Sequence, residues 1–184
     1  LHDALPICYF KSLTDTSVGI TKDDLKIHIQ PDKDSRTLTI TDNGIGMTKE
    51  ELEKNLGTIA RSGSLDFKTE NQSDNIDIIG QFGVGFYSAF MVAKKVTVIS
   101  RAQGADTAWK WESTGVEGYT LTEADKEDVG TEIILVLKDD TDTDKYSEYL
   151  EDYELANLVK KYSDYIRFPI TMYREKSRQK PKPE

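Results

Sequence analysis

A glycine-rich segment, GQFGVGFYS at residues 80–88, constrains the fold of this chain more than any other stretch of its sequence. Gly80, Gly83 and Gly85 lie within six residues, and an apolar run that suits a helix follows over residues 86–93. Glycine has no Cβ, so its backbone can adopt positive φ and approach a ligand closely. Amides at the start of a helix, with the helix dipole behind them, can hold a phosphate group. Taken alone, the segment fits equally well a turn that only lets a helix pack closely on a sheet.

Upstream of this segment, the sequence predicts a β-hairpin with one buried face. Leu25, Ile27 and Ile29 alternate with polar residues, as do Leu38 and Ile40. A turn-like segment, PDKDS at residues 31–35, separates the two alternating runs. Alternation with a period of two is typical of strands that bury one face.

The motif TDNGIGM at residues 41–47 follows the second of these strands. Asn-Gly is a common turn signal, so a plain turn is one interpretation. A turn, however, requires neither Asp42 directly after the apolar Ile40 nor a second glycine at Gly46. A carboxylate walled by Ile45 and Met47 can accept a hydrogen bond from an exocyclic amine, and an unpaired buried carboxylate would be costly. The motif therefore favours a ligand or a water molecule beside Asp42.

The remaining patterns predict an α+β two-layer sandwich. Thr48, with Glu51 three residues later, predicts the capped start of a helix. Residues 86–93 predict a second helix, and residues 146–162 predict one long amphipathic helix. Further strands are predicted at residues 95–101, 108–112, 131–137 and 169–173. The polar segment at about residues 57–80 is a candidate lid, because a long loop inside a compact domain is usually functional or mobile.

A third motif, GTEI at residues 130–133, opens one of the apolar strands. Thr131 could place a hydroxyl beside Asp42 and support it directly or through water, although a strand-favouring threonine after a turn glycine is the simpler interpretation. The chain contains no Gly-Lys pair, so it has no P-loop. Ser88 interrupts the dinucleotide fingerprint that begins at Gly83, which disfavours a Rossmann fold.

Composition narrows the class of protein further. The chain has 184 residues, which suits one domain, and a formal net charge of −9 without a basic face of the kind that binds nucleic acid. Its one cysteine, Cys8, excludes an internal disulfide and suits a reducing cytosol. No apolar run is long enough to span a membrane. We therefore expect a cytoplasmic protein with no nucleic-acid or membrane partner.

The order and spacing of these motifs resemble the ATP-binding domain of the heat-shock protein 90 chaperone family, and the bacterial HtpG type in particular. The resemblance runs from about residue 11, in KSLTD, to about residue 173. Relatives with the same nucleotide fold include DNA gyrase, MutL proteins and sensor histidine kinases, which have different lid and glycine-loop sequences. The segments LGTIARSG at residues 56–63 and QFGVGF at residues 81–86 match the chaperones.

The resemblance implies specific roles for individual residues. Asp42 would accept a hydrogen bond from the adenine amino group, helped by Thr131. The base would contact Met47 and Leu56, the sugar and phosphates would lie by Asn55, and the phosphates would lie near Arg61. The complete set of residues implied to bind the nucleotide is Asp42, Gly46, Met47, Asn55, Leu56, Arg61, Ser62, Gly63, Gly83, Val84, Gly85, Phe86 and Thr131.

The beginning of the chain departs from the family pattern. The family has a strand and a long helix before KSLTD, and that helix carries an acidic residue that activates the hydrolytic water and an asparagine that binds Mg²⁺. Residues 1–8 match neither, and Pro6 disfavours a helix there. We expect the fold to lack that first strand and helix, residues 1–10 not to match the family, and residues 1–8 to be of foreign origin, with a divergent native start as the alternative. We therefore expect no catalytic residue and poor ATP hydrolysis.

The resemblance also implies a domain plan and partners. Residues 11–173 would form the ATP-binding domain, and residues 174–184 would begin a linker to further domains. The function implied is that of a nucleotide-binding part of an ATP-dependent chaperone for unfolded client proteins, with ATP or ADP and Mg²⁺ as cofactors and a homodimer as the intact form. The alternatives are an ATPase module of the gyrase, MutL or histidine-kinase type, and an interaction domain that binds no nucleotide.

Overall fold

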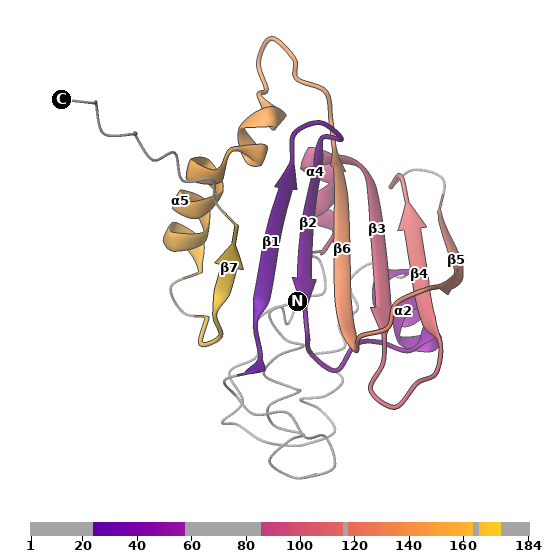
Figure 1. Cartoon of the computed structure of the whole chain (residues 1–184). Coiled ribbons are helices and arrows are strands. Elements are labelled where there is room, and N and C mark those ends of the chain that lie inside the picture. The colour runs from indigo at the N-terminus through magenta and orange to yellow at the C-terminus, as the bar shows by residue number, and fades with distance from the viewer. Residues whose placement is uncertain (1–23, 58–85, 116–117, 164–165, 174–184) are drawn as a thin grey trace, which may run out of the picture.

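The computed structural model of the chain describes residues 24–57, 86–115, 118–163 and 166–173. These residues form a seven-stranded sheet in the order β5-β4-β3-β6-β2-β1-β7 (Figure 1). Neighbouring strands are antiparallel, except that β1 and β7 are parallel. The strands are β1 (Ile27–Asp32), β2 (Thr37–Asp42), β3 (Ala93–Arg101), β4 (Ala108–Ser113), β5 (Tyr119–Ala124), β6 (Gly130–Leu137) and β7 (Ile170–Met172).

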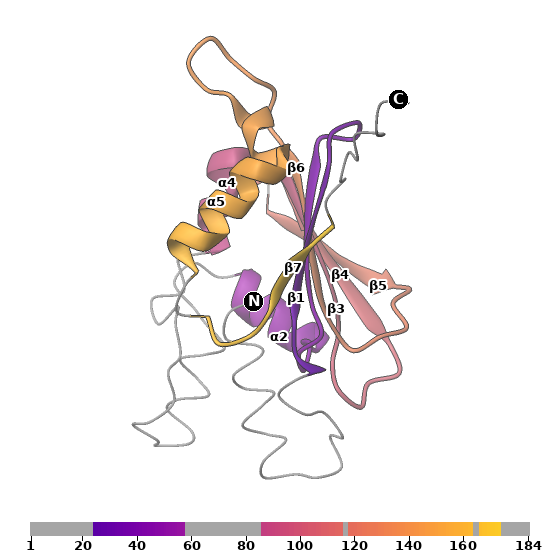
Figure 2. The same cartoon turned by 60° about the vertical axis from the view of Figure 1, so that its left-hand side comes forward.

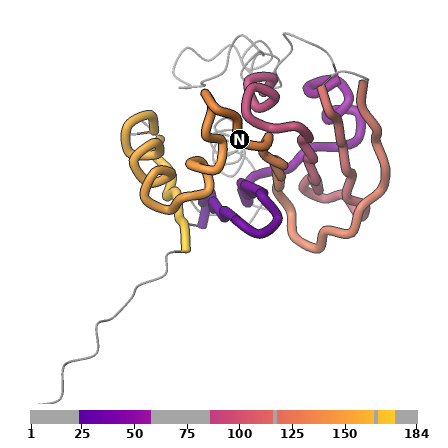
Figure 3. The backbone as a smooth tube through the Cα atoms, turned by 90° about the horizontal axis from the view of Figure 1, so that it is seen from above, coloured from indigo at the N-terminus to yellow at the C-terminus, as the bar shows by residue number. Residues whose placement is uncertain are grey.

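The helices form the second layer. They are α2 (Lys49–Leu56), the 3₁₀ helix η3 (Phe86–Ser88), α4 (Ala89–Val92), the 3₁₀ helix η4 (Tyr146–Leu150) and α5 (Asp152–Tyr162). Figure 2 shows α2, α4 and α5 on one side of the sheet. Seen from above, α5 lies at the β7 end of the sheet, away from β4 and β5 (Figure 3). The predicted α+β two-layer sandwich is confirmed. Within the described residues, no helix is long and apolar enough to cross a membrane.

The predicted hairpin is confirmed, and its alternation decides which face meets the helices. β1 and β2 pair in register from Ile27 with Asp42 to Asp32 with Thr37. Ile27 and Ile29 are buried in the core, whereas Gln30 on the opposite face is exposed. Because directly paired residues point to the same face of a sheet, Asp42 also points toward the helix layer.

The prediction of one helix over residues 146–162 is wrong. The 3₁₀ helix η4 ends at Leu150, and Glu151 adopts extended backbone angles of φ −86° and ψ 124° before α5 begins. Leu150 is fully buried, and Glu151 forms an ion pair with Lys33, whose Nζ lies 2.8 Å from its carboxylate. The break at Glu151 therefore accompanies the burial of Leu150 and an ion pair to the hairpin turn.

Two further elements differ from the predictions. The predicted helix over residues 86–93 forms as η3 and α4, but Ala93 already belongs to β3. Strand β5 was not predicted; its residues are exposed or half-buried, although Tyr119 and Leu121 alternate with Thr120 and Thr122. Its pairing with β4, from Ala108 with Ala124 to Ser113 with Tyr119, defines it instead.

The predicted start of α2 is confirmed as a capping box. The Thr48 hydroxyl accepts from the Glu51 amide at 3.2 Å, and the Glu51 carboxylate accepts from the Thr48 amide at 2.8 Å. Two amides that an α-helix leaves without internal partners are thereby satisfied. The cap fixes the orientation of a helix that buries Leu52 and Leu56.

Replacing Thr48 by alanine is expected to lower the free energy of unfolding by about 1 kcal/mol, because the Glu51 amide loses its acceptor. Urea denaturation followed by circular dichroism measures this change. Thr48→Ser is the matched control, since serine keeps the accepting oxygen and should leave the midpoint nearly unchanged. Equal midpoints for Thr48→Ala and the wild type would show that the box does not stabilise α2.

Candidate functional site

Asp42 and Thr131 lie side by side in the sheet. Asp42 ends β2, Thr131 is the second residue of β6, and the two form a direct cross-strand pair. Asp42 is 1% exposed and Thr131 is 3% exposed. Because both point toward the helix layer, a carboxylate and a hydroxyl are buried together between sheet and helices.

Only one oxygen of the Asp42 carboxylate has a partner among the described residues. The Gly44 amide donates to Oδ1 at 2.8 Å, as expected for an aspartate that precedes an Asn-Gly turn. The other oxygen, Oδ2, is buried and accepts no hydrogen bond within the described part of the chain. Burial raises the pKa of Asp42, while the amides of Gly44 and Thr131 act to lower it. An ionised carboxylate in this position requires a further donor.

Two glycines allow backbone segments next to Asp42 to approach one another closely. Gly46 has a φ of +64°, and a Cβ at this position would lie 1.9 Å from the carbonyl oxygen of Arg101. Gly130 has a φ of +123°, and its Cβ would lie 2.2 Å from the carbonyl oxygen of Asp42. Since L-residues rarely adopt such φ values and both clashes are with backbone, each position requires glycine. The sequence marked Gly46 as a site residue, and Gly130 as a turn glycine beside Thr131.

A serine that the sequence analysis did not single out connects the loop to β6. Ser100 on β3 is fully buried, and its Oγ accepts from the Met47 amide at 2.8 Å. The same Oγ lies 2.9 Å from Thr131 Oγ1 and 3.2 Å from the carbonyl oxygen of Gly130. The sequence could have identified Ser100 as a buried polar residue, because strict alternation places it on the same face as Val96 and Val98.

Helix α2 and η3 contribute the remaining described residues of the predicted site. Asn55 donates from Nδ2 to the sulfur of Met47 at 3.9 Å, while its Oδ1 is buried and lacks a partner among the described residues. Leu56 is buried, and its carbonyl accepts from the Tyr87 hydroxyl at 2.9 Å. Phe86 packs edge-on against the Trp111 ring, with centroids 5.5 Å apart. The helix layer therefore presents a second unsatisfied polar atom and apolar side chains.

The structure thus links Asp42, Thr131, Met47 and Asn55 through direct pairs and hydrogen bonds. The roles predicted for them stay predictions. Six of the predicted residues lie outside the described part of the chain, as do most of the candidate lid and most of the glycine-rich segment; these six are Arg61, Ser62, Gly63, Gly83, Val84 and Gly85.

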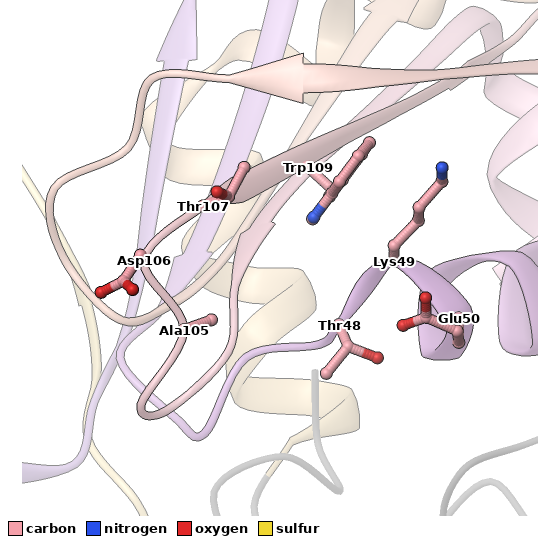
Figure 4. Close-up of a pocket in the computed structure, with 7 residues that line it drawn as sticks. All are labelled: Thr48, Lys49, Glu50, Ala105, Asp106, Thr107 and Trp109. Carbon is pink, nitrogen blue, oxygen red and sulfur yellow. The ribbon is translucent and has the colours of Figure 1, made fainter.

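A shallow pocket of about 350 Å³ lies elsewhere, where the start of α2 meets the turn between β3 and β4 (Figure 4). Within this lining, the Lys49 ammonium lies over the Trp109 ring, 4.5 Å from the ring centroid. None of the predicted site residues lines this pocket; its lining consists of Thr48, Lys49, Glu50, Ala105, Asp106, Thr107 and Trp109. The partnerless polar atoms, and not this hollow, therefore mark the candidate site.

Comparison with known proteins agrees with this geometry. The family model "Histidine kinase-, DNA gyrase B-, and HSP90-like ATPase" matches residues 11–143. Proteins named "Chaperone protein HtpG" are 59% identical over 97% of this chain in Clostridium acetobutylicum, 56% identical over 97% in Natranaerobius thermophilus and 57% identical over 92% in Bacillus subtilis. The chain spans 29%, 29% and 27% of the lengths of these three relatives. It belongs to the histidine kinase-, DNA gyrase B- and HSP90-like ATPase family, and its sequence corresponds to the nucleotide-binding part of an HtpG chaperone.

Proposed function

We propose that the residues around Asp42 bind the adenine base of ATP or ADP. The observation that carries this proposal is the Oδ2 atom of Asp42, which is buried and has no hydrogen-bond partner among the described residues. A buried acceptor of this kind is costly unless a donor meets it. An exocyclic amine on a flat, largely apolar base supplies that donor.

The polarity of the site favours adenine over guanine. An ionised Asp42 only accepts hydrogen bonds. The amino group of adenine donates, whereas guanine presents a carbonyl oxygen at the same ring position, which would face the carboxylate with like polarity. The Met47 and Leu56 side chains supply apolar surface suited to the faces of a base.

Asn55 suits the polar part of the same ligand. Its Oδ1 is buried without a partner among the described residues, so it can accept from a hydroxyl of the sugar. For the phosphates, the proposal rests on the family resemblance of Arg61, Ser62, Gly63 and the loop at residues 83–86. Among the described residues, no group of His, Cys, Asp or Glu fits a metal ion.

The wider assignments are also proposals. Residues 11–173 would form the nucleotide domain with a lid at residues 57–80, and residues 174–184 would begin a linker. A complete protein of this type would act as a cytoplasmic, homodimeric chaperone that uses ATP to handle unfolded client proteins. The HtpG relatives support this assignment over the gyrase, MutL and histidine-kinase alternatives.

Isothermal titration calorimetry with ADP, and then with GDP, tests the proposed function. We expect ADP to bind at one site and GDP to bind at least about tenfold more weakly, since one hydrogen bond to a charged group contributes about 1.5–3 kcal/mol. A chain that is folded by circular dichroism but binds no ADP at millimolar concentration would contradict the proposal. It would favour an interaction domain that binds no nucleotide.

A further inference from the structure

We propose that Ser100 is a positioning residue of the nucleotide site, which fixes the Met47 loop and sets the direction in which the Thr131 hydroxyl forms hydrogen bonds. The inference rests on the proposed function, because it concerns how the same site selects its ligand. It follows from the contacts of a single buried hydroxyl with two segments that are far apart in the sequence.

The position of Ser100 makes it a junction between these segments. It pairs directly with Thr131 across β3 and β6, while Thr131 pairs with Asp42 across β6 and β2. All three side chains are buried and lie in one row across the sheet. The loop after β2 contacts the same hydroxyl, because the Met47 amide donates to it.

The number of protons available fixes which group donates and which accepts in each hydrogen bond of Ser100. A serine hydroxyl has one proton and two acceptor lone pairs. The Met47 amide can only donate and the Gly130 carbonyl can only accept, so Ser100 accepts from the first and donates to the second. With all three contacts taken as hydrogen bonds, the 2.9 Å contact is the one in which Thr131 donates its proton to Ser100.

This order has a consequence for the ligand. With its proton directed to Ser100, the Thr131 oxygen has only acceptor capacity left for the site. An ionised Asp42 beside it also only accepts. The two side chains together therefore select a group with two protons to donate, such as a primary amine or a water molecule, and disfavour a carbonyl oxygen.

The burial of Ser100 argues against a purely packing role. Val96 and Val98 occupy the same face of β3 and fill the core with apolar side chains. A buried hydroxyl at the third position of this series costs free energy unless it is hydrogen-bonded. At Ser100 the site loop and β6 both supply such partners.

Ser100→Ala, Ser100→Thr and Ser113→Ala test the inference, with wild-type ADP binding as the reference. Ser113 is the matched control, because it is a buried serine on β4 whose hydroxyl donates to the Gly118 carbonyl and accepts from the Gly115 amide at 2.9 Å, outside the row of Asp42. The readouts are the affinities for ADP and for inosine diphosphate, in which a carbonyl replaces the amine, and hydrogen exchange at the Met47 amide.

We expect Ser100→Ala to weaken ADP binding about tenfold, to reduce the preference for ADP over inosine diphosphate, and to speed exchange at Met47. Ser100→Thr, which keeps the hydroxyl, should restore the preference, and Ser113→Ala should leave it unchanged. Wild-type preference and wild-type Met47 exchange in a folded Ser100→Ala would overturn the inference alone. Loss of preference in Ser113→Ala to the same degree would also overturn it. Failure of the wild type to bind ADP would instead overturn the proposed function.

Discussion

Replacing Asp42 by asparagine is expected to weaken ADP binding at least about tenfold and, at the same time, to raise the stability of the protein without ligand. The asparagine amide is nearly isosteric with the carboxylate, so packing is preserved. It removes the charged acceptor, whose hydrogen bond with the ligand we expect to contribute at least about tenfold in affinity. It also removes a buried charge whose Oδ2 atom lacks a partner among the described residues.

The direction of the stability change follows from the pKa of Asp42. Burial raises this pKa above its ordinary value, so the folded protein holds the proton more tightly than the unfolded chain does. The free energy of unfolding therefore falls as the pH rises from the ordinary pKa through the raised one, and it stays lowered above that. At neutral pH the free energy of unfolding of the wild type is therefore lowered by the buried Asp42, whereas that of Asp42→Asn is not.

Thermal unfolding between pH 4 and 8, together with ADP titration at pH 7.5, measures both effects. Asp139→Asn is the matched control, because it removes one negative charge from a largely exposed side chain that faces Lys94. The control should bind ADP normally and should keep the pH dependence of the wild type. Unchanged ADP affinity in Asp42→Asn would contradict the proposed role of the carboxylate, and a lowered midpoint at neutral pH would contradict the burial argument.

Replacing Gly46 by alanine is expected to destabilise the protein by roughly 2–6 kcal/mol and to prevent ADP binding. About 1–3 kcal/mol comes from placing a non-glycine residue at a φ of +64°. A further 1–3 kcal/mol, roughly, comes from overpacking, because the new Cβ would lie 1.9 Å from the Arg101 carbonyl oxygen. The loop must move away from β3, and the contact between the Met47 amide and Ser100 is lost with it.

Gly104→Ala separates the two contributions. Gly104 has a φ of +79° in the turn between β3 and β4, but no described atom beyond its chain neighbours lies within 4 Å of the position that a Cβ would occupy. It should therefore show only the conformational cost and should bind ADP normally. Urea denaturation and ADP titration of both variants provide the comparison. Equal destabilisation by Gly46→Ala and Gly104→Ala would show that the close approach to Arg101 does not constrain the loop.

The sequence predicts the local features of this protein well. The alternation of Ile27 and Ile29 predicts a hairpin that the structure contains, and the spacing of Thr48 and Glu51 predicts a helix cap that it also contains. Both features depend on neighbours within a few residues. The family resemblance, which the comparisons confirm, depends on motif order along the chain.

Features that depend on distant neighbours were missed. The break at Glu151 accompanies the burial of Leu150 and an ion pair to Lys33, which lies more than a hundred residues away in the sequence. Strand β5 has only the short alternation of Tyr119 and Leu121 with threonines, and its pairing with β4 establishes it. Ser100 becomes important only because the register of β3 and β6 places it beside Thr131, and no local pattern specifies that register.

The central claim is that the Asp42 carboxylate accepts a hydrogen bond from the exocyclic amine of a nucleotide. ADP and inosine diphosphate share the sugar and phosphates and differ in the group that would face this carboxylate. The decisive measurement is therefore the ratio of their dissociation constants, by calorimetry, for the wild type and for Asp42→Asn. We predict a preference for ADP of at least about tenfold in the wild type and almost none in Asp42→Asn. Equal binding of the two nucleotides by the wild type would contradict the claim.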